Sequence, residues 1–253
     1  MITQSIDFAQ LALYAFWIFF AGLIYWLRKE DRREGYPLEK DFPRRVGSTT
    51  NVLLPKPKTF LLPEGGEYQA PNFARDTRDF EIARTAPATG STSTPTTRNP
   101  LLAGVGPSSY AERHDEPELT REGRIAIVPM RVATDYRVTA GHDVRGWNLV
   151  GADGQVCGKV KDIWVDRAEM IVRYLEVGLG ENGDDVRLVP INTVVVRGDK
   201  SYVETEALRS TQLALAPTLK QTEQITLMEE ERIVAFFAGA RMYAEPKRMG
   251  PVV

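Results

Sequence analysis

Three charged residues close together in the chain are the best candidates for proton chemistry. Asp166 and Glu169 fall where one predicted strand ends, and Arg173 follows Asp166 by seven residues on the next predicted strand. Carboxylates beside a cation can exchange protons near neutral pH when burial and neighbouring charges shift their pKa values. The residue types alone favour a plainer interpretation, because acidic residues are common in turns and arginine is common on solvated strands. Both interpretations stay open at this level.

The rest of the sequence offers little for catalysis. It contains two histidines, His114 and His142, and one cysteine, Cys157, which leaves few ligands for a metal or haem. We expect the histidines in surface loops and Cys157 in or near a core. No nucleophile elbow, phosphate-binding glycine loop or metal-ligand spacing occurs in the sequence. We therefore expect neither an enzyme nor a metal site, and 32 basic against 34 acidic residues do not favour nucleic-acid binding.

A single apolar segment near the start of the chain predicts a membrane anchor. Residues 8–27 (FAQLALYAFWIFFAGLIYWL) contain Gln10 as the only strongly polar side chain. Twenty helical residues measure about 30 Å, the thickness of the hydrocarbon core of a bilayer. We expect a transmembrane helix with a cytoplasmic extension at residues 11–34, stopped by Gly35 and Pro37, after a short outer segment at residues 1–10.

Basic residues follow the anchor but do not precede it. By the positive-inside rule, this asymmetry places residues 1–10 outside and the remainder of the chain in the cytoplasm. The same side chains would attract anionic lipid headgroups at about 1 kcal/mol each, although a topology signal alone explains them nearly as well. They are Arg28, Lys29, Arg32 and Arg33.

Residues 35–109 are rich in proline, threonine, glycine and serine. Such a composition cannot bury enough apolar surface to fold alone, yet aromatic and leucine residues recur too often for a simple spacer. We interpret this region as an extended surface arm that takes its order from a partner surface, with a largely loose chain as the alternative.

Residues 110–253 have the rhythm of short strands followed by one helix. Tight turns and alternating apolar residues predict five or six strands that form a small antiparallel β-barrel. These strands are expected at residues 124–129, 147–150, 156–166, 170–179, 186–191 and 194–205.

The C-terminal helix is predicted from a capping box of Thr226 with Glu229, and Gly239 is placed to end it. Its apolar face is expected to consist of Leu227, Ile233, Val234 and Phe237.

Several stretches resemble the H subunits of purple-bacterial photosynthetic reaction centres, a PRC-barrel family, and they occur in the same order as in that family. The resemblance spans nearly the whole chain and is weakest at residues 40–52 and 68–98. The stretches are YAFWIFFAGLIYWLRKEDRREGYPLE (14–39), PKPKTFLLP (55–63), VGPSSYAERHDEPEL (105–119), IVPMRVA (127–133), GKVKDIWVDRAEMIVRYLEV (158–177) and ITLMEEERIVAFFAGARMYAEPKR (225–248).

The resemblance implies one transmembrane helix, a periplasmic N-terminus and a cytoplasmic, mainly-β domain built on a PRC-type barrel, in the inner (intracytoplasmic) bacterial membrane. Such a subunit caps the L and M subunits, stabilises the complex and guides protons to the secondary quinone during light-driven cyclic electron transfer. It implies no cofactor on this chain, because L and M hold the bacteriochlorophyll, bacteriopheophytin, quinones, non-haem iron and carotenoid.

The resemblance also implies roles for particular residues. Glu169 becomes the leading candidate for a proton-relay or electrostatic role, Asp166 is a weaker one, and Arg173 is the counter-charge. Some members of the family take up protons at an Asp and two His whose positions correspond here to Thr120, Glu122 and Arg124. That histidine-based uptake point is therefore in doubt. Glu122 together with Glu118 could replace it only as a carboxylate entrance.

The implied partners are the L and M subunits, membrane lipids including anionic ones, and core light-harvesting antenna polypeptides contacted by residues 86–100. An alternative from another functional class is a membrane-anchored PRC-barrel adaptor that docks a partner protein without quinone chemistry. Such an adaptor would share the barrel segment, but not the anchor and the PKPKTFLLP arm together with it. The coverage of the resemblance favours the reaction-centre subunit.

Overall fold

The computed structural model describes residues 8–36, 53–63, 65–72, 78, 80–84, 93–97, 99–180 and 182–249. The chain divides into two compact units, Met1–Arg78 and Asp79–Val253, so the predicted arm at residues 35–109 is shared between them. Most of the predicted outer segment, and most of the run 86–100 expected to contact antenna chains, lie outside the described residues.

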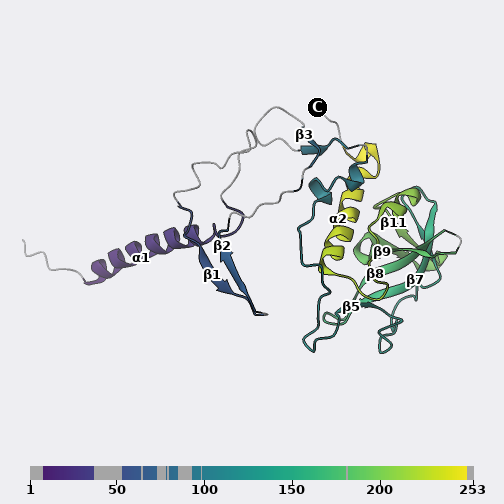
Figure 1. Ribbon diagram of the computed structural model, residues 1–253, viewed down its shortest axis with the longest axis horizontal. Coiled ribbons are helices and arrows are strands. Elements are labelled where there is room, and N and C mark those ends of the chain that lie inside the picture. The colour runs from purple at the N-terminus through teal and green to yellow at the C-terminus, as the bar shows by residue number, and fades with distance from the viewer. Residues whose placement is uncertain are drawn as a thin grey trace, which may run out of the picture. The chain divides into compact units, whose positions relative to one another are not determined.

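The first unit contains the apolar helix and one hairpin (Figure 1). Helix α1 (Phe8–Glu30) has 23 residues, buries none of them in the unit and is long and apolar enough to cross a membrane. It begins three residues before the predicted start and ends one turn before the predicted residue 34. The chain turns instead after Glu30, where Arg33 N donates to Glu30 O at 3.1 Å.

Two short hairpins lie in the region that the sequence analysis predicted as an extended arm. In the first unit β1 (Lys58–Leu61) pairs antiparallel with β2 (Glu67–Ala70), with Phe60 opposite Tyr68. In the second unit β3 (Ile82–Arg84) pairs with β4 (Ser93–Pro95). The sequence analysis predicted neither hairpin.

The second unit is built on a seven-stranded sheet in the order β10-β11-β6-β7-β8-β9, with β5 on β7. All pairings are antiparallel except that of β11 with β6, which is parallel, and the sheet does not close into a complete barrel. The mainly-β domain with a C-terminal helix is confirmed. The strands are β5 (Ile127–Pro129), β6 (Asn148–Val150), β7 (Val156–Asp166), β8 (Ile171–Leu179), β9 (Asp185–Pro190), β10 (Val194–Arg197) and β11 (Tyr202–Thr205).

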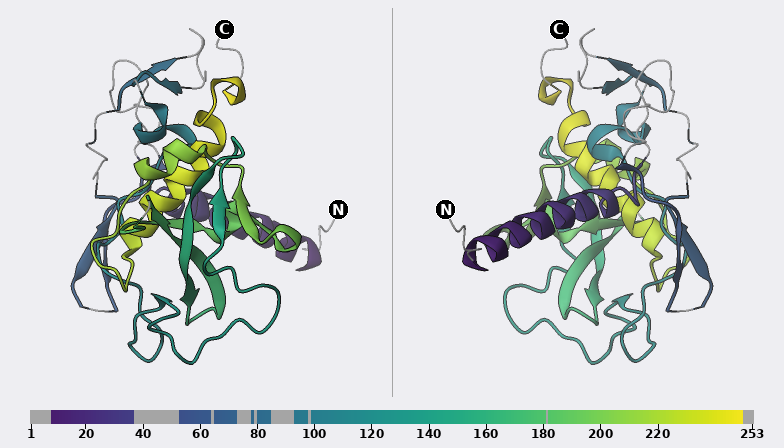
Figure 2. Two further views of the ribbon diagram at one scale, coloured as in Figure 1. Left: turned by 90° about the vertical axis from the view of Figure 1, so that its right-hand side faces the viewer. Right: turned by 90° about the vertical axis from the view of Figure 1, so that its left-hand side faces the viewer.

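Short 3-10 helices connect these elements. They span Pro100–Leu102, Gly106–Ser108, Ile191–Thr193, Gly198–Lys200, Ser210–Leu215 and Pro246–Arg248. The first two lie beside the C-terminal helix in both figures (Figures 1 and 2) and bury Leu101 and Ser108 there.

Helix α2 (Leu227–Tyr243) packs on the sheet, and its capping box is confirmed. Thr226 Oγ1 accepts from Glu229 N at 3.2 Å, and Glu229 Oε2 accepts from Thr226 N at 2.9 Å. The prediction that Gly239 ends the helix was wrong. Gly239 is buried inside α2, where a Cβ atom would stand 2.5 Å from Ser108 Cβ. Its missing side chain therefore lets the preceding segment approach the helix.

The core lies between β7, β8, β9 and α2. Trp164 is fully buried, and burial of each large apolar side chain contributes about 1.5–3 kcal/mol. Ile233 and Phe237 of α2 join this core as predicted, whereas Val234 is 45% exposed. The apolar face of α2 is completed instead by Phe236 and Ala240.

Candidate functional site

The turn between β7 and β8 positions the predicted site residues. Asp166 is the last residue of β7 and is buried, and its Oδ1 accepts from Ala168 N at 2.9 Å and from Glu169 N at 3.1 Å. An aspartate fits here because a short carboxylate can accept the free N–H groups of the turn that follows. Met170 completes the turn with a left-handed φ of 59°. The prediction that Asp166 and Glu169 lie at this turn, with Arg173 on β8, is confirmed.

Arg173 lies among three carboxylates. Its guanidinium nitrogens are 3.6 Å from Asp166 Oδ2, 3.8 Å from Glu169 Oε2 and 3.9 Å from Glu230 Oε2. These distances are those of ion pairs and are longer than a hydrogen bond. The Nε atom of Arg173 is buried and makes no hydrogen bond to any residue that the structure describes. One cation thus serves three acids, and the group as a whole carries excess negative charge when all three are ionised.

Glu230 is the member of this group that the sequence analysis missed. It lies on α2, is 8% exposed, and its Oε2 accepts a hydrogen bond of 3.0 Å from the Tyr174 hydroxyl. Burial raises the pKa of Glu230, and this effect outweighs the bond from Tyr174 and the charge of Arg173, which favour the ionised form. Burial also raises the pKa of Tyr174. A carboxyl group of this kind can hold a proton at a higher pH than a solvated glutamate.

A signal for Glu230 was present in the sequence. Glu230 precedes Ile233 by three residues and Phe237 by seven, so it lies on the same face of α2 as these core residues. A carboxylate on the apolar face of an amphipathic helix is the pattern that could have identified it.

A pocket of about 460 Å³ reaches Arg173 and Glu230 from the surface, whereas Asp166 and Glu169 do not line it. Glu118 is exposed and lines it, and its charge contributes to the raised pKa of Glu230. Glu122, the other weak candidate, lies in an exposed turn and does not line the pocket. The structure therefore brings Glu118 to the site but not Glu122. The lining residues are Arg113, Glu118, Ile171, Val172, Arg173, Tyr174, Pro190, Ile191, Asn192, Leu227, Glu230, Glu231 and Val234.

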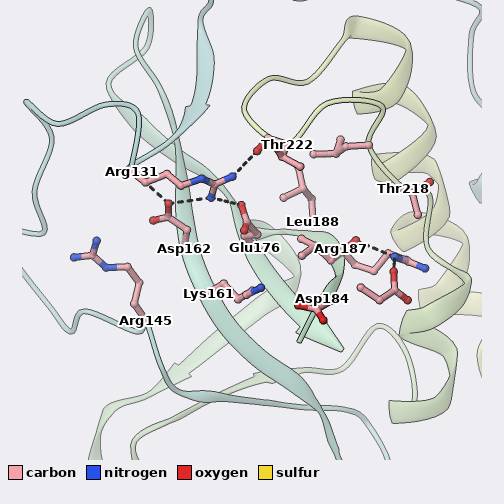
Figure 3. Close-up of a pocket in the computed structure, with 13 residues that line it drawn as sticks. Arg131, Arg145, Lys161, Asp162, Glu176, Asp184, Arg187, Leu188, Thr218 and Thr222 are labelled. Atoms are coloured by element: carbon pink, nitrogen blue, oxygen red, sulfur yellow. Dashed lines mark hydrogen bonds and ion pairs between the residues drawn. The ribbon is translucent and has the colours of Figure 1, made fainter. Parts of the chain in front are cut away.

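A second group of charges lines a larger pocket of about 790 Å³ elsewhere in the same unit (Figure 3). Asp162 and Glu176 are opposite each other on β7 and β8, and both are buried. Arg131 Nη1 lies 3.2 Å from Asp162 Oδ2 and 2.7 Å from Glu176 Oε2, and Trp164 Nε1 donates to the same Glu176 oxygen at 2.8 Å.

In this second group, the arginine leaves fewer hydrogen-bonding positions unfilled than Arg173 does in the first. The cation lies at hydrogen-bond distance from both acids, and its Nη2 also donates to Thr222 O, as Figure 3 shows. We therefore interpret Arg131, Asp162 and Glu176 as a structural ion-pair network that links the segment after β5 to the central strands β7 and β8.

The remaining predicted residues are placed as follows. His114 and His142 are exposed loop residues, as predicted. Cys157 is half-buried against the core, and burial raises the pKa of its thiol to about 12. Among the described ranges, no group of three or more His, Cys, Asp or Glu is arranged to hold a metal ion.

The basic residues after the anchor differ in their surroundings. The Arg28 side chain is exposed, with Asp31 at 3.9 Å, and Arg32 lies over the ring of Tyr36. Lys29 is partly exposed. The side chain of Arg33 is only 11% exposed and donates to Glu30 and to two backbone carbonyls. Arg33 is therefore engaged within the chain, whereas the other three side chains are at least partly exposed.

Two family models match the chain. A model described as photosynthetic reaction centre, H-chain N-terminal region, matches residues 1–132, just over half of the 253 residues. A PRC-barrel domain model matches residues 137–210. The first match includes α1 and Glu118, and the second includes Asp166, Glu169, Arg173 and Tyr174. Glu230 and α2 lie outside both.

Proposed function

Because this chain belongs to the family of photosynthetic reaction-centre H chains, we propose that it caps the cytoplasmic face of the L and M subunits and guides protons to the secondary quinone. Family membership establishes a membrane-anchored subunit that associates with L and M. The proposal adds the orientation, with residues 1–10 periplasmic and the domain cytoplasmic, and the proton role. In this proposal the chain is a structural subunit and not an enzyme.

The observation that carries the proton role is the group of three carboxylates around Arg173. A quinone that receives two electrons in a buried site must also receive two protons, which travel through titratable side chains and water. Glu230 can hold a proton because burial raises its pKa. Asp166 and Glu169 lie within 4 Å of the same guanidinium, so a change of charge on one acid is felt by the others.

The groups form a series with two exposed ends, because the Glu169 side chain is 61% exposed. The direction of transfer is taken from the family resemblance. Glu118 is exposed at the pocket and can take up protons from water. Glu230 lines the same pocket and is buried, and Asp166 is buried at the end of β7. We propose uptake at Glu118, retention at Glu230 and transfer past Arg173 toward Asp166 and Glu169, the pair that the family resemblance places on the quinone side.

The charge balance supports an electrostatic role as well. With one arginine among three acids, added negative charge on a nearby quinone would raise the proton affinity of the acids and draw a proton into the group. The same group could therefore take up a proton before the second electron arrives.

Further contacts belong to the same proposal. Arg28, Lys29 and Arg32 would contact anionic lipid headgroups, and residues 86–100 would contact core antenna polypeptides. A crosslinking map of intact membranes tests the antenna contact, which is excluded if residues 86–100 give no crosslink to any antenna chain.

The test of the proton role is flash-induced proton uptake and second-electron transfer to the secondary quinone in membranes that carry Glu169→Gln or Glu230→Gln. Each variant should assemble normally and slow the second transfer by roughly tenfold or more, because a positioned proton donor is worth about 10²–10⁴-fold where no other route exists. Glu122→Gln, outside the pocket, is the matched control and should behave as wild type. Unchanged kinetics in both test variants would leave the chain as a scaffold without a proton role.

A further inference from the structure

The β1–β2 hairpin exposes two apolar rings on one face, and on the other face it exposes Leu61 opposite Glu67. Phe60 is 42% exposed and Tyr68 39%, and they are paired across the strands on one face. Leu61, which is 80% exposed, points to the other face because side chains alternate along a strand, and Leu62 follows it at 48%. A two-stranded hairpin is marginally stable in water, so a medium or partner that covers these side chains would stabilise it.

Ion pairs and hydrogen bonds hold the base of the hairpin to the end of α1. Glu30 Oε2 lies 2.7 Å from Arg33 Nε and 3.0 Å from Lys58 Nζ. Arg33 Nη1 donates to Lys56 O at 3.0 Å and to Ala70 O at 2.9 Å. The hairpin therefore cannot move far from the last turn of the helix while these contacts are intact.

This attachment fixes the depth of the hairpin relative to a membrane. Glu30 follows Leu27, the end of the apolar run, by three residues, which is about 4.5 Å along the helix. The headgroup layer is about 5–7 Å thick on each side of the hydrocarbon core. The Glu30–Lys58 pair thus lies in that layer, and the hairpin runs across the helix axis in both figures rather than continuing along it (Figures 1 and 2).

The composition of the hairpin fits the boundary between headgroups and acyl chains. Leucine and aromatic rings prefer the apolar side of this boundary, whereas Lys56, which is exposed, can reach anionic phosphates. A hollow of about 300 Å³ lies at the base of the hairpin. It is lined by Phe60, Tyr68 and Ala70 and by the charged residues Glu30, Asp31, Arg33 and Glu34.

We propose that the β1–β2 hairpin is a second membrane-contacting element, which lies in the headgroup layer and inserts Leu61 and Leu62 among the lipids. At this depth the two leucines can reach the acyl chains, while Glu67, opposite Leu61, stays among the headgroups. A protein docked on the face of Phe60 and Tyr68 is the alternative that the test separates. The proposal depends on α1 crossing a membrane and is independent of the proton role.

The test is the environment of a spin label at position 61 in the assembled complex in its native membrane. Leu61→Cys is introduced on a Cys157→Ala background and labelled, and accessibility to oxygen and to a water-soluble nickel chelate is measured. Oxygen partitions into the bilayer and the chelate does not, so the oxygen-to-nickel ratio should be several-fold higher than at the matched control Val196→Cys. Val196 is 42% exposed on β10 of the other unit.

Other outcomes would overturn the proposal. A label at position 61 that is protected from both reagents would show that a protein subunit covers the hairpin. A label with a ratio like that of position 196 would show that the hairpin faces water. Adding Arg33→Met should lower the ratio at position 61 toward the control, and an unchanged ratio would contradict the role of the attachment to α1.

Discussion

The Tyr174 hydroxyl on β8 donates a hydrogen bond of 3.0 Å to Oε2 of Glu230 on α2. This contact joins the central sheet to the C-terminal helix. Its acceptor, Glu230, is a carboxylate on the apolar face of α2, and burial raises its pKa. The protonation state of Glu230 is therefore coupled to the packing of the helix, and this coupling has a measurable pH dependence.

Glu230→Gln should change how stability depends on pH. Burial raises the folded-state pKa of Glu230 above its ordinary value of 4.5. The contribution of this group is therefore fully present below the unfolded-state pKa and is lost as pH rises through the folded-state pKa. Because Gln cannot ionise, the variant should gain stability relative to wild type over that range, by about 1.4 kcal/mol per unit of raised pKa.

Chemical unfolding of the full chain in detergent across this range measures the effect. The control for loss of charge from α2 is Glu231→Gln. Glu231 lies on the same helix as Glu230 and pairs with Arg113. The same pH profile in both variants would contradict the interpretation based on burial.

Asp115→Asn should have the opposite pH dependence. Lys220 and the Thr226 hydroxyl donate to the carboxylate of Asp115, and these bonds lower its pKa below its ordinary value of 3.8. Its contribution is therefore present above the unfolded-state pKa and is lost as pH falls through the folded-state pKa. The variant should unfold at a lower denaturant concentration than wild type at neutral pH and at the same concentration in acid. A stability loss that persists in acid would mean that the charge is not responsible.

Arg131→Met should destabilise the second unit strongly. It leaves Asp162 and Glu176 buried without their common cation, a change that costs about 3 kcal/mol, the low end for a broken buried ion pair because Arg131 is itself partly exposed. The triple variant Arg131→Met, Asp162→Asn, Glu176→Gln is the matched control and should recover part of the loss. Denaturant midpoints measure both, and equal losses would show that uncompensated charge is not the cause.

Gly239→Ala should also destabilise the chain, by about 1–3 kcal/mol, because the new Cβ would stand 2.5 Å from Ser108 Cβ in a packed interior. Val234→Ala, at a 45% exposed position on the same helix, should change stability much less. Thermal unfolding distinguishes the two variants. An unchanged midpoint for Gly239→Ala would show that the segment carrying Ser108 can move away from α2 without loss.

The parts of the fold that were predictable from sequence depend on local patterns. The strands around Asp166 and Arg173 alternate and are separated by a turn, so their pairing places the two residues together. The capping box of α2 needs only Thr226 and Glu229, three residues apart. The early end of α1 was not predicted. Just beyond it, Arg33 bonds to backbone groups 23 and 37 residues away, which no local pattern indicates.

The candidate site shows the same division. Asp166, Glu169 and Arg173 are neighbours in sequence, and the family resemblance made them candidates, whereas Glu230 meets Tyr174 across 56 residues. Arg131 meets Asp162 and Glu176 across 31 and 45 residues. Charged residues within apolar strands or on an apolar helix face are the only local sign of such partners.

The close approach of Gly239 to Ser108 has a consequence for how the chain could be divided. Residues 99–131 also contribute β5 to the sheet, the bridge of Pro117 with Thr226, and Arg131. A cut between residues 132 and 137 would separate all of these from their counterparts. The barrel domain that the family model matches, residues 137–210, is thus smaller than the unit that must fold as one. If that domain were transplanted alone, it would lack residues that precede it and residues that follow it, and both are needed to keep it intact.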